Sequence, residues 1–193
     1  MLEIKHKLKK SKFKAPSVAK IILTAVGLAG LVTIAVIAPN SLQMLKLFGL
    51  GKRQYKPRSV YGTYKRMQKE RWIEVEKRGN KIIIKTTVKG KKKFLDYQFE
   101  EMRIKRPEKW DGKWRVVGFD IPEKIKKARN ALRNKLTELG FWQIQKSLFV
   151  LPYDCRKEIN FIADFFQVQD YILLIEAATI TNEDYLKDKF KLN

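Results

Sequence analysis

The sequence contains one cysteine and one histidine, and each shortage excludes a kind of protein. Cys155 has no second cysteine to pair with, so a fold held by internal disulfides is excluded. His6 and Cys155 together cannot supply the usual ligand set of a zinc site. A cytoplasmic location is therefore expected.

Acidic residues are also scarce. The chain of 193 residues has 20 Asp and Glu against 42 Lys and Arg, a net charge of +22, which predicts a polyanionic partner: nucleic acid or an anionic membrane surface. Residues 1–106 hold 27 of the cations and 7 of the acids, whereas residues 107–193 hold 15 and 13. The stretch Lys105–Lys113 is polar, contains Asp111-Gly112 and has no apolar period. We therefore expect two domains, divided near Pro107.

The first 16 residues are expected to be a basic arm ahead of a domain at residues 17–106. Six lysines lie between Met1 and Lys14, opposed only by Glu3. Such a run is typical of a solvated tail or of an arm that contacts phosphates, and the sequence leaves both interpretations open.

Residues 21–38 form an uncharged apolar run that permits two interpretations. Its length reaches the lower limit for a membrane-spanning helix, which would anchor the protein in the inner membrane facing the cytoplasm. Both flanks are basic, so the positive-inside rule gives no orientation. The other interpretation is a buried helix that ends at Pro39-Asn40, followed by a short helix over Ser41–Leu47.

The next stretch predicts a helix and a hairpin. Pro57 is suited to the first turn of a helix over Arg58–Glu70, with Val60, Tyr64 and Met67 on one side. Two β-rich runs follow, Trp72–Val75 and Lys81–Thr87, joined by a turn that contains Gly79-Asn80. After Lys89-Gly90-Lys91, a further helical run extends to Met102.

This order of elements resembles the winged helix-turn-helix superfamily. The resemblance implies that the helix over Arg58–Glu70 enters the DNA major groove and that the hairpin tip is a wing along the backbone. Gly62 departs from the pattern, because glycine inside a helix costs about 1 kcal/mol relative to alanine. The DNA-binding residues expected on this basis are Arg58, Tyr61, Lys65, Arg66 and Lys69 in the helix, and Lys77, Arg78 and Lys81 in the wing.

The second domain, residues 107–193, has the pattern βαββαβ, which is typical of a ferredoxin-like fold. The fold class expected for the whole chain is therefore α+β. The two helices would cover one face of the sheet and leave the other for pairing, which predicts a homodimer. The expected elements are strand Trp114–Ile121, helix Glu123–Leu139, strands Phe141–Gln145 and Ser147–Tyr153, helix Arg156–Phe166, strand Tyr171–Ala178 and a last helix or tail at Asn182–Lys191.

Three sequence segments carry a more specific resemblance: VVGFDIPE, LTELGF and IQKSLFVLPYD. They resemble the small CRISPR-associated endonuclease of the adaptation module and, equally, the central domain of the PaaX-like transcriptional repressors, over Trp110–Ala178. The basic winged-helix pattern ahead of them favours the repressor family. That resemblance implies a DNA-binding transcriptional repressor, associated with the nucleoid and without a cofactor. The chain ends at Asn193, ahead of the further region of full-length repressors, so sensing of an acyl-thioester stays open.

Asp120 is the one candidate catalytic residue. In the CRISPR family, the aspartate that ends the first strand is proposed to hold a divalent cation with its copy across the dimer, so the resemblance implies a Mg²⁺ site here. The other interpretation is that Asp120 caps the following helix or loop through its side chain. Asp154 is a weaker candidate with the same alternative.

The remaining conspicuous residues have structural interpretations. Trp110, Trp114 and Trp142 are expected to pack in the core or at the domain junction. Cys155 is expected to be a loop thiol, or a thiol whose pKa is lowered by the neighbouring Arg156. Lys146 and Ser147, by analogy with the CRISPR family, would contact a phosphate, although strand alternation explains them as well.

The sequence thus favours a dimeric DNA-binding transcriptional regulator that binds duplex DNA. One alternative is a Mg²⁺-dependent endonuclease or CRISPR adaptation subunit that uses Asp120. Another is a DNA-binding protein tethered to the membrane through residues 21–38. The DNA target, the regulated genes and any effector ligand do not follow from the sequence.

Overall fold

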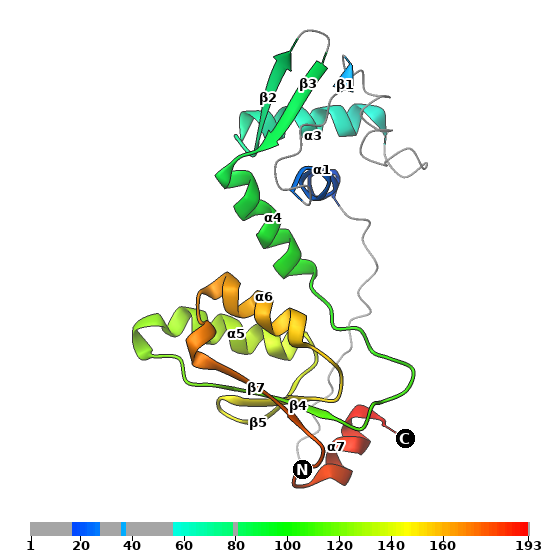
Figure 1. The fold of residues 1–193 in the computed structure, drawn as a ribbon, viewed down its shortest axis with the longest axis vertical. Helices are drawn as coiled ribbons and strands as arrows, with labels where there is room; N and C mark the ends of the chain where they lie inside the picture. Colours follow the sequence, from blue (N-terminus) through cyan, green and yellow to red (C-terminus); the bar gives the residue numbers. More distant parts are fainter. Residues whose placement is uncertain (1–16, 28–35, 38–55, 79–80, 193) are drawn as a thin grey trace, which may run out of the picture. The chain divides into compact units, whose positions relative to one another are not determined.

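The computed structural model describes residues 17–27, 36–37, 56–78 and 81–192 (Figure 1). The chain divides into two compact units, residues 1–97 and residues 98–193. The domain limits expected at residues 16 and 106 stay predictions, and the basic arm lies outside the described residues.

Unit 1 combines helices with one small antiparallel sheet of strand order β1-β3-β2. Helix α1, helix α3 and a hairpin follow one another as expected, whereas strand β1 between the two helices was not expected. The hairpin register runs from Ile73 opposite Thr86 to Arg78 opposite Lys81. The elements are α1 Val18–Gly27, β1 Val36–Ile37, α3 Pro57–Lys69, β2 Ile73–Arg78, β3 Lys81–Thr86 and α4 Val88–Glu101, the last of which continues into unit 2.

One apolar cluster holds unit 1 together. Ile22 and Leu23 of α1 pack with Val60 and Met67 of α3 and with Ile84 of β3, and all are almost fully buried. Burying a side chain of this size contributes about 1.5–3 kcal/mol, so the apolar side of α3 is firmly fixed in the core.

The apolar run at residues 21–38 is divided between two elements. α1 ends at Gly27, and Val36 and Ile37 are extended and pair with Ile82 and Lys81 of β3. The expected single helix ending at Pro39-Asn40 is therefore wrong. No helix in the described part of the chain is both long enough and apolar enough to cross a membrane. The short helix expected at Ser41–Leu47 lies outside the described residues.

α4 begins with a hydroxyl cap and a close backbone contact. The Thr87 hydroxyl accepts a hydrogen bond from the Gly90 N–H at 3.0 Å and donates one to the Arg71 carbonyl oxygen at 2.6 Å. A Cβ on Gly90 would lie 1.9 Å from the Trp72 carbonyl oxygen, so only glycine fits this approach. Lys89-Gly90-Lys91, expected as a lead-in, thus lie in the first turn of the helix.

Unit 2 has the expected ferredoxin-like βαββαβ order, and the α+β class is confirmed. Its antiparallel sheet has the strand order β5-β6-β4-β7, with the first strand of the motif, β4, inside the sheet. The helix expected to start at Glu123 begins instead as a 3-10 turn. The elements are β4 Trp114–Phe119, the 3-10 turn Glu123–Ile125, α5 Lys126–Glu138, β5 Trp142–Gln145, β6 Leu148–Leu151, α6 Arg156–Phe166, a 3-10 turn Gln169–Tyr171, β7 Ile172–Ala177 and α7 Glu183–Phe190.

Helices lie on both faces of this sheet (Figure 1). On one face, α5 and α6 bury Leu132 and Ile162 against Val117 and Phe149. On the other face, Leu186 of α7 packs in a separate cluster that contains Trp114, Val116 and Val150. The second face, expected to be open for pairing, is therefore partly covered by α7.

The core of unit 2 extends upstream of Pro107. Phe99, near the end of α4, stacks on Phe165 with ring centroids 4.6 Å apart and meets Phe166 edge-on at 5.3 Å. Met102 and Ile104 pack against the same cluster. The last turn of α4 and the segment after it are thus part of the second core.

Candidate nucleic-acid interface

α3 separates its side chains into a buried face and a charged face. Val60, Tyr64 and Met67 are at most 4% exposed, in agreement with the period expected from the sequence. The candidate residues are all exposed, and they are Arg58, Tyr61, Lys65, Arg66 and Lys69. In the described part of the chain, none of these four cations pairs with a carboxylate. The structure therefore brings the helical candidates together on one exposed surface.

Tyr61 adds an aromatic surface to this basic face. The Lys65 ammonium lies 5.6 Å from the centroid of the Tyr61 ring, within reach of a cation–π interaction. Tyr61 is 41% exposed and also contacts Tyr64, with the two ring centroids 6.3 Å apart. Burial, and secondarily the nearby Tyr61, raises the pKa of Tyr64 above its ordinary value of 10.0, so Tyr64 stays neutral and packs in the core.

The wing candidates lie at the ends of the hairpin strands. Lys77 and Arg78 end β2, Lys81 begins β3, and Arg78 is opposite Lys81 in the register. The side chains of these three residues, and the turn at residues 79–80, lie outside the described part of the structure.

Asp120 is exposed and follows directly after β4. Its backbone N–H donates to the Tyr171 carbonyl oxygen at 3.0 Å, but its carboxylate makes no hydrogen bond or ion pair with the described residues. The expected side-chain cap is therefore wrong: neither the 3-10 turn nor α5 has one. Within the described ranges, no three His, Cys, Asp or Glu side chains cluster so as to hold a metal ion.

The two residues after Tyr153 have structural roles. Asp154 accepts a hydrogen bond from the Arg156 N–H at 3.1 Å, so its side chain holds the loop ahead of α6, although α6 has no side-chain cap at its N-cap, Cys155. Cys155 is fully buried, and that burial raises the pKa of its thiol to about 12. Cys155 does lie in the loop ahead of α6, as expected, but the expectation of a lowered pKa is wrong.

The tryptophans pack as expected. Trp114 is fully buried and its indole N–H donates to a Glu183 carboxylate oxygen at 3.1 Å. Trp110 lies against Trp114, with ring centroids 4.9 Å apart, and the Lys189 ammonium lies 4.0 Å from the Trp142 ring. These contacts attach α7 to the sheet.

The turn between β5 and β6 holds the other two residues considered as phosphate contacts. Lys146 is exposed, and its carbonyl oxygen accepts a hydrogen bond from the Arg133 guanidinium at 3.0 Å. The Ser147 carbonyl oxygen accepts one from the Phe119 N–H at 3.1 Å. Both residues therefore have backbone roles in this turn.

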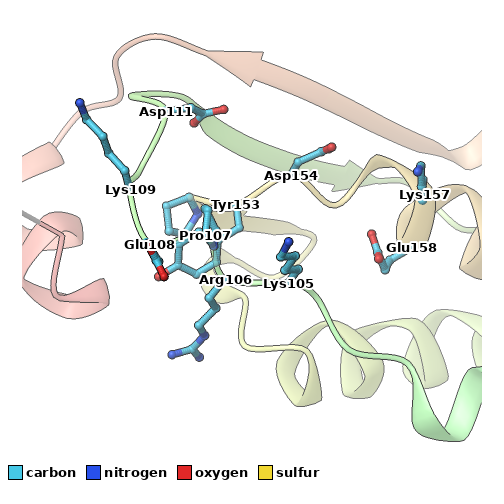
Figure 2. Close-up of a pocket in the computed structure, with 11 residues that line it drawn as sticks. Lys105, Arg106, Pro107, Glu108, Lys109, Asp111, Tyr153, Asp154, Lys157 and Glu158 are labelled. Atoms are coloured by element: carbon cyan, nitrogen blue, oxygen red, sulfur yellow. The ribbon is translucent and has the colours of Figure 1, made fainter.

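Unit 2 also contains a cleft of about 780 Å³, and Figure 2 shows its lining side chains around Tyr153. Four cations (Lys105, Arg106, Lys109, Lys157) and four acids (Glu108, Asp111, Asp154, Glu158) line it. One wall is held by Asp111, which makes a two-pronged ion pair with the buried guanidinium of Arg115, at 2.5 and 2.7 Å. That hydrogen bonding lowers the pKa of Asp111 from 3.8 to about 2. With balanced charges, the cleft selects neither anions nor cations.

A comparison with protein-family models matches residues 107–187 to the family described as the PaaX protein central Cas2-like domain. The match starts ahead of β4 and ends within α7, and it includes neither α3 nor the β2–β3 hairpin. A comparison with curated proteins finds no match.

Proposed function

Because residues 107–187 match the PaaX protein central Cas2-like domain, we propose that the chain is a PaaX-like transcriptional regulator of the repressor type that binds duplex DNA. The observation that carries this proposal is the exposed face of α3. Its cations have no carboxylate partners among the described residues, while the opposite face is fixed in the core. A rigid helix with free Lys and Arg side chains is suited to the DNA major groove.

The individual side chains have different tasks in this proposal. Lys65 and Lys69 contact phosphates and position the helix, because an ammonium group is a point charge without a fixed geometry. Arg58 and Arg66 carry planar guanidinium groups that match guanine edges with two parallel hydrogen bonds. Lys77, Arg78 and Lys81 at the hairpin tip follow the neighbouring backbone as a wing.

Two copies of the chain are proposed to pair through the second face of the unit 2 sheet. Leu173 and Ile175 of β7 are 60% and 44% exposed, and they alternate with Ile172 and Leu174, which pack toward the α5 and α6 side. The exposed pair therefore forms an apolar strip on the face that α7 covers only in part. A symmetric dimer would present two α3 helices to two half-sites.

The partners and location follow from this function. Duplex DNA and a second copy of the chain are the proposed partners, and the proposed place of action is the nucleoid in the cytoplasm. No cofactor takes part in the proposed activity.

The double substitution Lys65→Ala and Lys69→Ala tests the proposal. Removing two phosphate contacts lowers the slope of log affinity against log salt concentration by about 1.8, and affinity falls for duplexes of any sequence. Fluorescence anisotropy with a labelled duplex at several salt concentrations measures both quantities.

The matched control is Lys109→Ala with Lys157→Ala, which removes the same charge from exposed positions in the unit 2 cleft. This control keeps the wild-type slope. If the α3 variant also keeps the wild-type affinity and slope, the proposed DNA-binding surface is wrong.

The unpaired carboxylate of Asp120 supports a second candidate function, a Mg²⁺-dependent endonuclease. Incubation of the purified protein with DNA and RNA plus Mg²⁺, beside Asp120→Ala, separates the two functions. A regulator leaves both nucleic acids intact, and Asp120→Ala binds duplex DNA as wild type does. Cleavage that disappears in Asp120→Ala would establish the nuclease instead.

A further inference from the structure

The start of α4 carries exposed cations outside the expected DNA-binding set. Lys89, Lys91 and Lys92 are exposed, whereas Lys93 is partly buried, with its ammonium 5.9 Å from the Trp72 ring and 4.8 Å from the Tyr97 ring. The lysine run therefore divides into one side chain that packs against aromatic rings and three that face solvent.

These lysines lie next to the end of α3. The Lys89 ammonium is 3.6 Å from the carboxylate of Glu70, the residue that follows α3. The Thr87 hydroxyl donates to the Arg71 carbonyl oxygen, and Gly90 packs directly on the Trp72 carbonyl oxygen. Backbone contacts thus fix the start of α4 against the turn between α3 and β2.

Little negative charge opposes these cations. The first turn of α4 contains no acidic residue, and in the described ranges no carboxylate pairs with Lys91 or Lys92. Cations at the start of a helix are disfavoured by the helix dipole, and like charges three residues apart, such as Lys89 and Lys92, repel each other. An anion bound here would remove both unfavourable effects.

Arg71 adds a fourth exposed cation, in a backbone conformation that favours glycine. The Arg71 N–H donates to the Gln68 carbonyl oxygen, and the Trp72 N–H donates to the Met67 carbonyl oxygen. These two hydrogen bonds end α3 in a Schellman motif, in which Arg71 has a φ of 55°. Gly140 holds the equivalent position after α5 at φ 94°. Gln167 and Lys191 also adopt left-handed conformations after helices, so the conformation alone marks no site. At Arg71, however, it combines with three neighbouring lysines.

We infer that Arg71, Lys89, Lys91 and Lys92 form a second phosphate-binding surface, which contacts the duplex backbone beside the segment that α3 reads. The inference rests on the proposed DNA-binding function and extends its footprint to a part of the protein outside the recognition helix and wing. The surface contacts phosphates alone, so it adds affinity for duplexes of any sequence and no base preference.

Substitution of Lys91 and Lys92 by alanine tests the lysines. Loss of two phosphate contacts lowers the slope of log affinity against log salt concentration by about 1.8. When the salt concentration rises from 50 to 200 mM, the fold-loss of affinity is therefore about 12 times smaller for the variant than for wild type. Relative affinities among duplexes of different sequence stay the same. The control Lys109→Ala with Lys157→Ala keeps the wild-type slope.

Substitution Arg71→Gly tests the arginine with two readouts of opposite sign. Relief of the left-handed conformation raises the melting temperature of unit 1 by about 4–8 °C, while loss of the guanidinium lowers the salt slope by about 0.9. If Arg71 has only a structural role, Arg71→Gly raises the melting temperature but leaves the salt slope unchanged. That result would show that Arg71 is not part of the phosphate-binding surface.

The outcomes distinguish this inference from the proposed function. If Lys65→Ala with Lys69→Ala weakens binding and Lys91→Ala with Lys92→Ala does not, the second surface is wrong and the function stands. If wild type binds no duplex, both are wrong. A third outcome is that wild type binds vesicles containing phosphatidylserine and that Lys91→Ala with Lys92→Ala abolishes this binding but leaves duplex affinity unchanged. The ligand of the second surface would then be a membrane and not DNA.

Discussion

The ion pair between Asp111 and Arg115 shows how one residue attaches a loop to the unit 2 sheet. The guanidinium is 5% exposed and also donates to the carbonyl oxygens of Lys113 and Pro152. Asp111 is half-exposed, so solvent screens part of the interaction. Because the partner guanidinium is buried, removing the carboxylate costs it its hydrogen-bonded ion-pair partner.

Asp111→Asn should therefore destabilise unit 2 by about 1–2 kcal/mol near neutral pH. The pKa of Asp111 is about 2 in the folded protein and 3.8 ordinarily, so its stabilising effect is complete above pH 3.8 and is lost as the pH falls through about 2. Urea unfolding at several pH values, followed by tryptophan fluorescence, measures the difference between wild type and variant.

The exposed carboxyl of Asp170 supplies the control, since no ion pair joins it to a described residue. Asp170→Asn keeps the wild-type pH dependence. A difference for Asp111→Asn that does not shrink toward low pH would show that the substitution acts through packing instead.

Single residues were the hardest features to predict from the sequence. Cys155 lies next to Arg156 in the chain, but its pKa is set by burial, which sequence neighbours do not report. Asp154 and Asp120 both follow strands, yet only Asp154 has an N–H within reach of its side chain. The ion pair of Arg115 with Asp111 could not be predicted from the sequence, because it depends on how the loop ahead of β4 folds.

Whole elements were predicted far better. The limits expected for α3, α6 and β7 differ from the observed ones by at most one residue, because apolar side chains at helical spacing mark α3 and α6 and a continuous apolar run marks β7. The expectation of one helix over residues 21–38 is wrong, since the run contains no charged side chain to mark where the helix ends and the strand begins. The phosphate-binding surface inferred at the start of α4 could have been predicted from the lysine run at residues 89–93, which contains no acidic residue.

Two helical glycines should respond to alanine in opposite directions. A Cβ at Gly62 of α3 meets nothing within 4 Å, so Gly62→Ala stabilises unit 1 by about 1 kcal/mol through helix propensity. At Gly90, a Cβ would overlap the Trp72 carbonyl oxygen, so Gly90→Ala destabilises by about 1–3 kcal/mol. Thermal unfolding followed by circular dichroism compares the pair, each serving as the control for the other. Equal effects would contradict the contact between α4 and Trp72.

At the scale of the whole molecule, the charge is divided between the two parts of the chain. Residues 1–106 carry 27 cations against 7 acids, and residues 107–193 are nearly neutral. A nearly neutral ferredoxin-like unit with an exposed apolar strip is suited to pairing with its own copy, because like charges do not oppose association. The chain thus separates the surfaces proposed for DNA and for dimerisation.

Leu173→Glu should convert the proposed dimer to a monomer, because it places a charge in the centre of the apolar strip. Analytical ultracentrifugation over a range of protein concentrations measures the change. Val88→Glu is the control, since Val88 is 86% exposed at the start of α4 and belongs to no apolar strip of unit 2. A wild-type monomer, or a dimer that persists in Leu173→Glu, would contradict this mode of pairing.

The stacking of Phe99 on Phe165 determines where the second unit can be cut from the chain. A fragment that begins at residue 107, where the family match starts, would lack the Phe99 ring that contacts Phe165 and Phe166 and lies 4.7 Å from the ammonium of the buried Lys135. Newly exposed aromatic rings promote aggregation. A fragment that begins at Gln98 keeps these contacts, so the piece able to fold alone starts nine residues before the piece that sequence comparison finds.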